Sequence, residues 1–391
     1  MNHFWRPAWV EVDIDRVIHN IHEIRKQIGK SVQIIAALKG DAHGHGAVEM
    51  ARQCISAGVE RIGVALVDEG IELRRNHIDI PILVFGYVSG QLAEAIDNNL
   101  TLTIYLKDVA EKISLFAKKM KKIVKVHLKV DTGLNRIGLE PEEVIDFCHF
   151  VRKLGGIEIE GVYSHFASSA KKDKTEAYLQ FKIFQEVLNK LKKSGITIPV
   201  AHIANTGAIM EMSDTYLDAV RTGRLIFGVY PYPEVKKVID LHPALQLKCE
   251  IARIKKISAG EGVGYRAVFK TDRSTYIATL PLGYTDGLSK AFINKASVLI
   301  GGKRKKVIAM CADMCMVNLG SEEPQVKAGN EVVLIGRQGK EIIMAEELAD
   351  ALGVTLGEIF AHLNRRLPKV YTHQSKPYLV AMPNGDFVNI D

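Results

Sequence analysis

Residues 34–46 read IIAALKGDAHGHG and place a lysine at the end of an apolar run. The five apolar residues at 34–38 predict a strand that is buried on both faces. Lys39 follows this strand, three glycines interrupt the next residues, and a helical pattern begins at Ala47. A lysine at the mouth of such a loop can hold a carbonyl cofactor as a Schiff base. A lone lysine at a strand end is more often simply turned to solvent, so the rest of the chain must decide.

Eight short apolar or β-branched runs follow one another between residues 34 and 221, separated by helix-length amphipathic stretches. The runs are 34–38, 62–66, 82–85, 100–105, 124–128, 160–164, 199–203 and 218–221, and the helical stretches include 13–29, 47–57, 91–98, 141–154 and 174–193. Strands that alternate with helices predict a parallel sheet, most economically a closed (β/α)8 TIM-type barrel. A doubly wound open sheet is the alternative, but no GxGxxG motif follows the first strand.

The pattern changes near residue 240. Residues 245–251 alternate between apolar and polar, which predicts a half-exposed strand. Further short strands are expected at 274–280, 296–300, 306–310 and 331–335, with glycine-rich turns between them. We therefore expect an α/β barrel domain over residues 1–240 and a mostly β C-terminal domain over residues 241–391. The run AWVEV at 8–12 precedes the barrel pattern and is a candidate for pairing with the second domain.

Composition excludes several classes of function. The chain has 391 residues, 47% hydrophobic content, a net charge of +7 and five cysteines without CxxC spacing. These cysteines predict reduced thiols rather than a disulfide frame or a metal site. Apolar runs long enough for a membrane span and a secretory signal are both missing, so a cytoplasmic protein is expected. The lysine runs at 118–122 and 303–306 lack interleaved aromatics and predict solvated surface, not nucleic-acid binding.

Polar side chains fall repeatedly at the carboxyl ends of the predicted barrel strands, which meet at one mouth of the fold. They are Lys39, Lys129, Asp131, Arg136, His165, Asn205, Thr206, Arg221 and Arg224, and Gly223 lies within the same strand-end segment 221–224. Each alone could be a strand-end group bonded to its own loop. The loops after strands seven and eight, 205–207 and 221–224, lie where such barrels commonly bind phosphate. A Schiff-base lysine combined with a phosphate site indicates pyridoxal 5'-phosphate (PLP).

Ordered motifs along nearly the whole chain resemble the alanine racemase family, whose members combine a PLP-binding barrel with a β domain. They are KGDAHGHG at 39–46, KVDTGLNR at 129–136, SHFA at 164–167, HIANT at 202–206, VRTG at 220–223, VGY at 263–265, GYTDG at 283–287 and CAD at 311–313. Any one of these would be a weak signal, but their order and spacing together are specific.

The resemblance implies two acid/base residues on opposite faces of the substrate. Lys39 would hold PLP and exchange a proton with one face of the substrate Cα. Tyr265, supplied by the partner subunit of a homodimer, would serve the opposite face. A histidine matching His165 would support the tyrosine and be bonded to an arginine matching Arg221, which faces the pyridine nitrogen.

The resemblance also implies a substrate pocket and a cofactor site. Arg136 would bind the substrate carboxylate, with Lys129, which is carbamylated in some relatives, orienting it. Tyr284 and the backbone near Ala312 and Asp313 would complete the pocket from the partner subunit. The remaining cofactor-binding positions would be His43, Asn205, Thr206, Gly223, Arg224 and Arg365, and no metal is implied.

Several positions depart from the family pattern. His43 and Arg365 stand where tyrosines are usual, Arg224 replaces an aliphatic residue, and Ala312 replaces a common methionine. Gly264 and Arg266 also flank Tyr265 where serine and glycine are more usual. One hypothesis is that the phosphate site has been rebuilt from neutral hydroxyls toward cations, which a dianionic phosphate tolerates. Another is that Arg365 and Ala312 reshape the pocket for serine or for a larger, acidic side chain.

The activity implied is interconversion of L- and D-alanine, which would supply peptidoglycan in a bacterial source. Alternatives within the family are a preference for serine or another larger amino acid, or a broad substrate range. Outside the family, a barrel-type PLP decarboxylase of basic amino acids would release carbon dioxide. A PLP-binding barrel protein without racemase activity is a third class, but such proteins lack the second domain that carries Tyr265.

Overall fold

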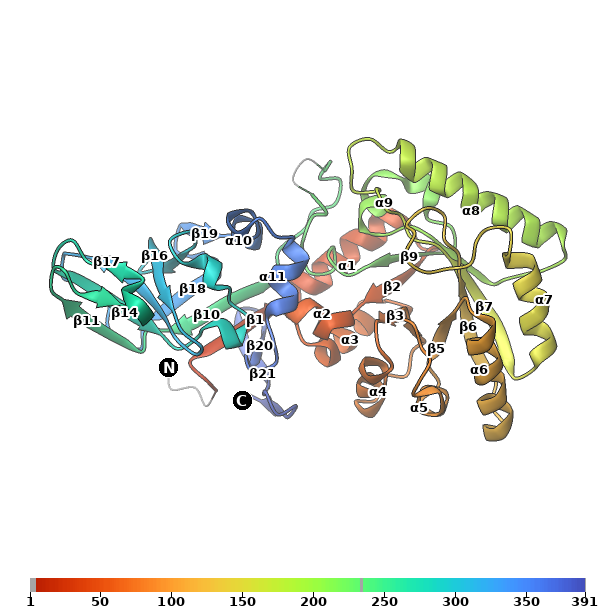
Figure 1. Cartoon of the computed structure of the whole chain (residues 1–391), viewed down its shortest axis with the longest axis horizontal. Helices are drawn as coiled ribbons and strands as arrows, with labels where there is room; N and C mark the ends of the chain where they lie inside the picture. Colours follow the sequence, from red (N-terminus) through yellow and green to blue (C-terminus); the bar gives the residue numbers. More distant parts are fainter. Residues whose placement is uncertain (1–4, 233–234, 391) are drawn as a thin grey trace. The chain divides into compact units, whose positions relative to one another are not determined.

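The computed structural model describes residues 5–232 and 235–390, whose contacts divide into two compact units (Figure 1). Residues 16–42 and 47–243 form the first, here named the barrel unit. The second, named the β unit, contains residues 244–390 together with two earlier segments, 5–15 and 43–46. The family-like residues are therefore distributed over both units.

Eight parallel strands form the sheet of the barrel unit, in the order β8-β7-β6-β5-β4-β3-β2-β9. They are β2 (Gln33–Ala37), β3 (Arg61–Val64), β4 (Ile82–Val84), β5 (Thr101–Ile104), β6 (Val124–Lys129), β7 (Ile157–Tyr163), β8 (Val200–His202) and β9 (Ala219–Thr222). Backbone bonds from Asp218 N to Ala201 O (3.1 Å) and from Arg221 N to Ala204 O (2.9 Å) nearly close the ring. The predicted (β/α)8 barrel is thereby confirmed.

Helices alternate with these strands, and Figure 1 shows α4 to α8 on the outside of the sheet. They are α1 (Ile14–Ile28), α2 (Lys39–Gly44), α3 (Ala47–Ser56), α4 (Val67–Arg75), α5 (Leu92–Asp97), α6 (Lys107–Met120), α7 (Val144–Leu154), α8 (Thr175–Lys193) and α9 (Thr206–Glu211). In α1 the apolar stripe Val17, Ile21 and Ile24 is fully buried, as its helical spacing predicts. Within the described ranges, no helix combines the length and apolar composition that crossing a bilayer requires.

The segment after Lys39 differs from the glycine-broken loop that its sequence predicts. Gly40, Asp41, Ala42, His43 and Gly44 all have positive φ, between 53° and 82°, so α2 is a left-handed turn. For a residue other than glycine, this conformation costs about 1–2 kcal/mol. Oδ1 of Asp41 accepts the amide of the first residue of α3 at 2.9 Å, which joins the turn to the following helix. The lysine is thus followed directly by a strained stretch of backbone.

The β unit contains a twelve-stranded sheet with the path β11-β14-β17-β16-β15-β18-β10-β1-β20-β21-β22, and β19 pairs with β18. Strand β1 (Ala8–Asp13) runs antiparallel to β10 (Leu245–Glu250) and parallel to β20 (Lys369–His373). The other strands are β11 (Arg253–Ile257), β14 (Thr275–Leu280), β15 (Ser297–Ile300), β16 (Lys303–Met310), β17 (Cys315–Gly320), β18 (Glu331–Gln338), β19 (Glu341–Ile343), β21 (Lys376–Ala381) and β22 (Phe387–Asn389). The mostly β character expected for this part of the chain is confirmed.

Smaller elements of the β unit carry or support candidate residues. A separate hairpin pairs β12 (Gly262–Val263) with β13 (Phe269–Lys270), and the 3-10 turn η2 (Tyr265–Ala267) connects them. A second 3-10 turn, η3, spans Tyr284–Asp286. Two helices that the sequence reading did not identify, α10 (Ala345–Leu352) and α11 (Leu356–His362), precede β20.

Candidate active site

The guanidinium of Arg221, in β9, is the most heavily bonded group at the candidate site. Its side chain is buried, and NH1 donates to Nδ1 of His202 at 2.6 Å and to the carbonyl of the same residue at 3.2 Å. NH2 contacts the carbonyl oxygens of Ser164 and Ile203 at 2.7 and 3.1 Å and Nδ1 of His165 at 3.1 Å. All of these acceptors are uncharged, and they lie at the end of β8 or in the residues that directly follow β7 and β8.

The Arg221 contacts fix the protonation of two imidazoles. Burial lowers the pKa of Arg221 to about 10, so it remains a cation at neutral pH and can only donate. Nδ1 of both His202 and His165 must therefore accept, which leaves the proton on Nε2. Burial, reinforced by the charge of Arg221, lowers the pKa of His165 to about 2 and that of His202 well below its ordinary value. Both histidines are neutral with a defined tautomer.

A directed chain of hydrogen bonds continues from His202 through the barrel interior. Nε2–H of His202 donates to Nδ1 of His127 at 2.9 Å, and Nε2–H of His127 donates to Oε2 of Glu160 at 3.2 Å. The carboxylate also accepts from Arg61 at 2.7 Å and from Lys125 at 2.9 Å. Burial alone would raise the pKa of Glu160, but these three donors lower it well below its usual range. The chain therefore ends on a permanent anion.

Tyr163 forms an aromatic wall beside this chain. Its ring stacks on His202 with centroids 4.8 Å apart and planes 5° apart, and Arg221 and Lys129 lie 5.2 and 5.3 Å from its centroid. Its hydroxyl lies 2.9 Å from Oγ1 of Thr103, which itself donates to a backbone carbonyl. Burial raises the pKa of Tyr163 to about 12, so this phenol stays protonated and serves as packing rather than as a base.

Several cations share the end of the barrel where Lys39 stands. Much of the length of Lys39 is surrounded by protein although its side chain stays accessible, and this partial burial, together with Arg136 and Arg224, lowers its pKa. Lys129 is buried and donates to the carbonyl of Val130 at 2.9 Å. Its burial, then the charge of Arg221, lowers its pKa to about 7. Both amines consequently have an increased neutral fraction, which is the nucleophilic form.

Arg136 is held by the turn that follows β6. One carboxylate oxygen of Asp131 accepts the amides of Gly133, Leu134 and Asn135 at 2.9 to 3.1 Å, and the other accepts that of Arg136 at 3.1 Å. Burial opposes ionisation of Asp131, but these amide donors lower its pKa overall. The backbone that carries the exposed guanidinium of Arg136 is therefore fixed by the ionised carboxylate of Asp131.

The two loops expected to bind phosphate lie side by side. Oδ1 of Asn205 caps α9 by accepting the amide of Ala208 at 3.3 Å, and it also accepts from Oγ of Ser169 at 2.5 Å. Oγ1 of Thr206 lies 3.3 Å from Oγ1 of Thr222, which joins the end of β8 to the end of β9. Gly223 and the half-buried Arg224 follow directly in the chain.

The donor set of the barrel unit suits PLP. An amine whose pKa is lowered can react with an aldehyde, whereas Arg136 and Arg224 are suited to a carboxylate and a phosphate. The two hydroxyls Thr206 and Thr222 add neutral donors at the loops after β8 and β9. These groups therefore fit the cofactor that the sequence predicts.

Tyr265 belongs to the β unit and is 78% exposed. It follows Gly264, which has φ 75° and whose added Cβ would lie 2.8 Å from the Cβ of Ala309. Val263 and Ala309 share one apolar cluster, so the hairpin that carries the tyrosine is packed onto β16 while its tip faces outward. The backbone of the hairpin is thus fixed by packing while the phenol of Tyr265 stays exposed, as suits a residue that contacts a second chain.

Tyr284, Ala312 and Asp313 lie together in the β unit. Amides of Tyr284 and Thr285 donate to the carbonyls of Cys311 (3.2 Å) and Ala312 (3.0 Å), and Oγ1 of Thr285 donates to Asp313 at 2.8 Å. A Cβ at Gly283 would lie 2.3 Å from the Cys311 carbonyl, so the approach needs glycine.

The segment that carries Arg365 also joins this cluster. Arg366 donates to Asp313 at 2.7 Å, and Asn364 donates to the carbonyl of Thr285 at 2.7 Å. Arg365, between them, is exposed, whereas His43 is half-buried within the left-handed turn. The predicted residues thus form one set in the barrel unit and one in the β unit.

Comparisons with known proteins match both parts of the chain. Family models described as the N-terminal and C-terminal domains of alanine racemase match residues 12–231 and 244–371. The chain belongs to the alanine racemase family. Enzymes of this family are racemases, which are isomerases.

Relatives of the family match over almost the whole chain. An alanine racemase of Desulforamulus reducens is 42% identical over 369 residues, covering 93% of this chain and 99% of that protein. A solved structure of alanine racemase from Clostridium difficile 630 has a TM-score of 0.93 at 34% identity, covering 97% of this chain and 100% of that one. Histidine racemase from Leuconostoc mesenteroides subsp. sake has a TM-score of 0.87 at 28% identity, covering 95% and 100%.

Sequence patterns alone did not assign roles to four buried residues: His127, Glu160 and His202 of the hydrogen-bonded chain, and Tyr163 beside it. His202 stands in the motif HIANT, but it was not separated there from its neighbours as a site residue. The alternation VKVHLK at 124–129 was the available signal, because a barrel strand can direct alternate polar residues inward as well as outward.

We predict that Glu160→Gln destabilises the protein by about 2–3 kcal/mol at neutral pH, because the partly buried cation Arg61 loses its anionic partner. The native pKa of Glu160 lies below its ordinary 4.5, so its charge stabilises the fold above that pH and less as the pH falls below it. Urea unfolding at neutral and acidic pH measures both effects.

Glu158→Gln is the matched control, since Glu158 is an exposed carboxylate on the same strand. It should change the free energy of unfolding by less than about 0.5 kcal/mol. Equal effects of the two substitutions, or a Glu160→Gln effect that grows toward acid pH, would contradict the assignment of Glu160 as the buried anion.

Proposed function

We propose that this chain is a PLP-dependent racemase that interconverts L- and D-alanine with Lys39 and Tyr265 as its two acid/base residues. The observation that carries the proposal is the neutral His165, fixed by Arg221 as a donor through Nε2–H, at the same barrel end as an amine of lowered pKa. The family membership and the names of the relatives support the reaction class.

When bound, PLP supplies an electron sink that stabilises negative charge at the substrate Cα. Lys39 holds the cofactor through its amine and, when released, moves a proton on one face of the substrate. Tyr265 moves a proton on the opposite face. Two bases on opposite faces are needed, because one base alone returns the proton to the side that it left.

His165 lowers the cost of ionising the tyrosine. An unperturbed phenol has a pKa of about 10 and is a poor base at neutral pH. Nε2–H of His165 can donate to a phenolate, and the tautomer that provides this donor is set by Arg221. Because Arg221 keeps its own proton, it would leave the ring nitrogen of bound PLP unprotonated, which would moderate the electron sink that the cofactor supplies and disfavour side reactions such as transamination.

Arg136 binds the substrate carboxylate in this proposal, and Lys129 positions Arg136. The pKa of Lys129 of about 7 leaves much of its amine neutral and able to form a carbamate. Arg221 and Arg136, the cations that lower this pKa, would stabilise the resulting anion. Tyr284 and the backbone at Ala312 and Asp313 complete the pocket from the partner subunit.

Phosphate binding is assigned to the loops after β8 and β9 and to the departures from the family pattern. The proposed residues are Asn205, Thr206, Gly223, Arg224, His43 and Arg365. One observation supports this role for Arg224: its positive charge is close enough to Lys39 to contribute to the lowered pKa of that amine. A cationic phosphate site would compensate for the absence of the two tyrosines that the family usually has at positions 43 and 365.

The biological setting follows from the same proposal. We infer a homodimer with shared active sites, a barrel domain and a β domain that meet in the chain near residue 240, a cytoplasmic location, and supply of D-alanine to peptidoglycan. The exposure of Tyr265 supports the shared site, since a phenol on an outward-facing hairpin is available to a second chain.

We predict that PLP-loaded protein racemises L-alanine fastest among a panel of L-amino acids that includes serine, glutamate and histidine. Circular dichroism of each amino acid measures the loss of optical activity. Faster turnover of serine or a larger residue would favour a pocket reshaped by Arg365 and Ala312. Release of carbon dioxide from lysine or arginine without racemisation would indicate a decarboxylase instead.

Subunit complementation tests the shared site. Lys39→Ala and Tyr265→Phe homodimers should each be nearly inactive, because each site lacks one of its two bases. A refolded equimolar mixture should regain about one quarter of wild-type activity, because half the dimers are mixed and each mixed dimer has one intact site. If both residues of a site came from one chain, mixing would restore no activity.

The cationic phosphate hypothesis predicts weaker PLP retention in Arg224→Ala and Arg365→Ala, by about tenfold for each lost charge-assisted contact. Equilibrium dialysis against increasing free PLP measures this affinity. Arg337→Ala, which removes an exposed arginine of β18, is the control and should retain PLP like the wild type. Unchanged affinity for PLP in both Arg224→Ala and Arg365→Ala would contradict the hypothesis.

A further inference from the structure

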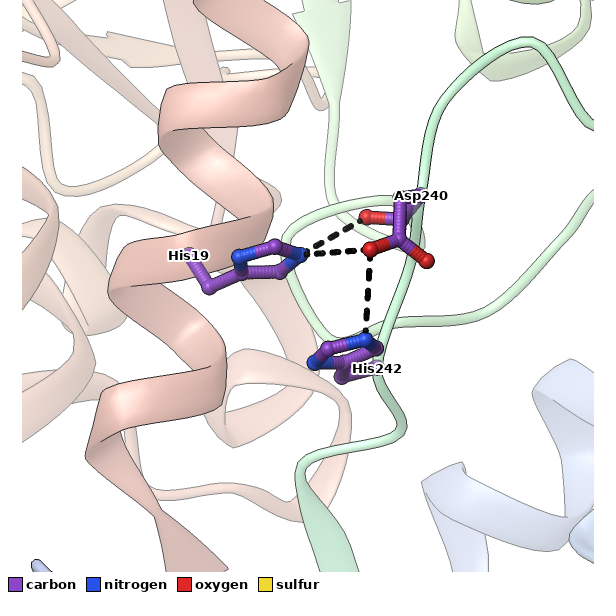
Figure 2. Close-up of side chains that lie close together, drawn as sticks. All are labelled: His19, Asp240 and His242. Atoms are coloured by element: carbon purple, nitrogen blue, oxygen red, sulfur yellow. Dashed lines mark hydrogen bonds and ion pairs between the residues drawn. The ribbon is translucent and has the colours of Figure 1, made fainter.

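A cluster of two histidines and one aspartate lies in the barrel unit, apart from the candidate active-site residues. Figure 2 shows His19, from α1, facing Asp240 and His242 of the segment that leads from β9 to β10. Nε2 of each histidine lies 3.4 Å from the same carboxylate oxygen, Oδ2 of Asp240. One ligand atom from each residue lies within 4.8 Å of the other two.

We propose that His19, Asp240 and His242 bind a divalent transition-metal ion of the zinc class. Zinc takes nitrogen and carboxylate oxygen ligands at about 2.0–2.1 Å in a tetrahedral arrangement. The edge of such a tetrahedron is about 3.4 Å long, as follows from those bond lengths. Both nitrogen–oxygen separations in the cluster therefore already equal the spacing of two ligands that share one tetrahedral ion.

The two imidazoles are arranged so that both present a nitrogen to the same side. Their rings stack with centroids 4.2 Å apart and planes 10° apart. Nε2 of His19 also lies 3.1 Å from the carbonyl oxygen of Asp240, so this ring faces the backbone and the carboxylate together.

The backbone beneath this cluster is fixed by a buried asparagine next to His19. Asn20 is fully buried, and its amide nitrogen donates to the carbonyls of Ile226 (3.0 Å) and His242 (2.9 Å). Its oxygen accepts the amide of His242 at 2.8 Å. The spacing of His19 and His242 is thus set by a fully satisfied buried side chain rather than by exposed groups alone.

Further contacts fix the residues on either side of Asp240 and His242. The hydroxyl of Tyr230 donates to the carbonyl of Ile239 at 2.9 Å and accepts the amide of Leu241 at 3.4 Å. Arg16, from α1, donates to the carbonyl of Pro243 at 2.8 Å. Preorganisation of this kind reduces the entropy that a bound ion must offset.

The donor types select the class of ion. Two imidazoles and one carboxylate suit Zn²⁺, Co²⁺, Ni²⁺ or Cu²⁺, whereas Mg²⁺ and Ca²⁺ prefer oxygen ligands alone. The side chains of His19, His242 and Asp240 are 33%, 49% and 68% exposed, which leaves room for water as the fourth ligand. Without an ion, exposed histidine–aspartate pairs contribute little to stability. A bound ion would cross-link α1 to the segment before β10 and stabilise the fold by mass action.

The test uses the PLP-loaded protein after removal of metals with a chelator. Titration with Zn²⁺ against a chromophoric competitor should show one site that is weakened by more than about tenfold in His19→Ala, in His242→Ala and in Asp240→Asn. His149→Ala removes an exposed histidine of α7 and is the matched control, expected to bind like the wild type. Mg²⁺ should not compete.

Two independent readouts accompany the titration. Co²⁺ should give the intense visible absorption of a tetrahedral complex in the wild type and not in the histidine variants, and Zn²⁺ should raise the unfolding temperature of the wild type alone. Equal Zn²⁺ affinity in the wild type and in His19→Ala/His242→Ala would overturn the proposal, as would equal loss in the control. Racemase activity does not enter either readout, so the outcome is independent of the proposed function.

Discussion

The barrel unit contains a buried positive charge, Arg221, that no carboxylate within residues 5–232 and 235–390 contacts directly. Arg221 is surrounded by three backbone carbonyls and two imidazole nitrogens, all neutral. Burying a guanidinium in this way is costly unless its donors are satisfied. Both terminal nitrogens make these contacts, and the group remains a cation at neutral pH, with a pKa that burial lowers to about 10. The same contacts force His165 and His202 to be neutral, so one cation determines the protonation of both imidazoles.

The carboxylate to which Arg221 is linked by hydrogen bonds, that of Glu160, lies two imidazoles away. Glu160 is reached only through His202 and His127, each of which accepts on Nδ1 and donates on Nε2. All hydrogen bonds of this chain therefore point the same way, from the guanidinium toward the carboxylate. A carboxylate in direct contact with Arg221 would neutralise it locally and weaken its donation to His165. Two imidazoles separate Arg221 from Glu160, whose direct ion pairs are with Arg61 and Lys125, so the guanidinium keeps its donation to His165.

The sequence predicted the parts of this arrangement that follow from local patterns. Alternating apolar runs located all eight barrel strands to within a few residues, and the rule that strand ends meet at one mouth selected Lys39, Lys129, His165 and Arg221. The roles of His127 and Glu160 were not predicted, because a polar residue within a strand is ordinarily expected to face solvent. Only the closure of the sheet into a ring shows that these side chains face its interior. The left-handed turn was not predicted for a different reason. Gly40 and Gly44 indicate that positive φ angles are possible there, but the positive φ of Ala42 and His43 is imposed by their surroundings. The twelve-stranded order of the β unit depends on pairings such as β1 with β20, which join the two ends of the chain and leave no local pattern.

The chemistry of the barrel unit also explains why the proposed reaction needs a residue from elsewhere. His165, with a pKa of about 2, does not take up a second ring proton at neutral pH, and Tyr163, with a pKa of about 12, does not release its proton. Lys129 donates to a backbone carbonyl and is buried, which leaves Lys39 as the accessible amine among these groups. One amine serves one face of a substrate carbon. In the proposed reaction, a phenol on the opposite face would gain stabilisation of its anion from the Nε2–H of His165. A neutral histidine suits this role because it donates without charge, whereas a cationic imidazolium would stabilise the phenolate so strongly that it would be a poor base toward the proton on Cα.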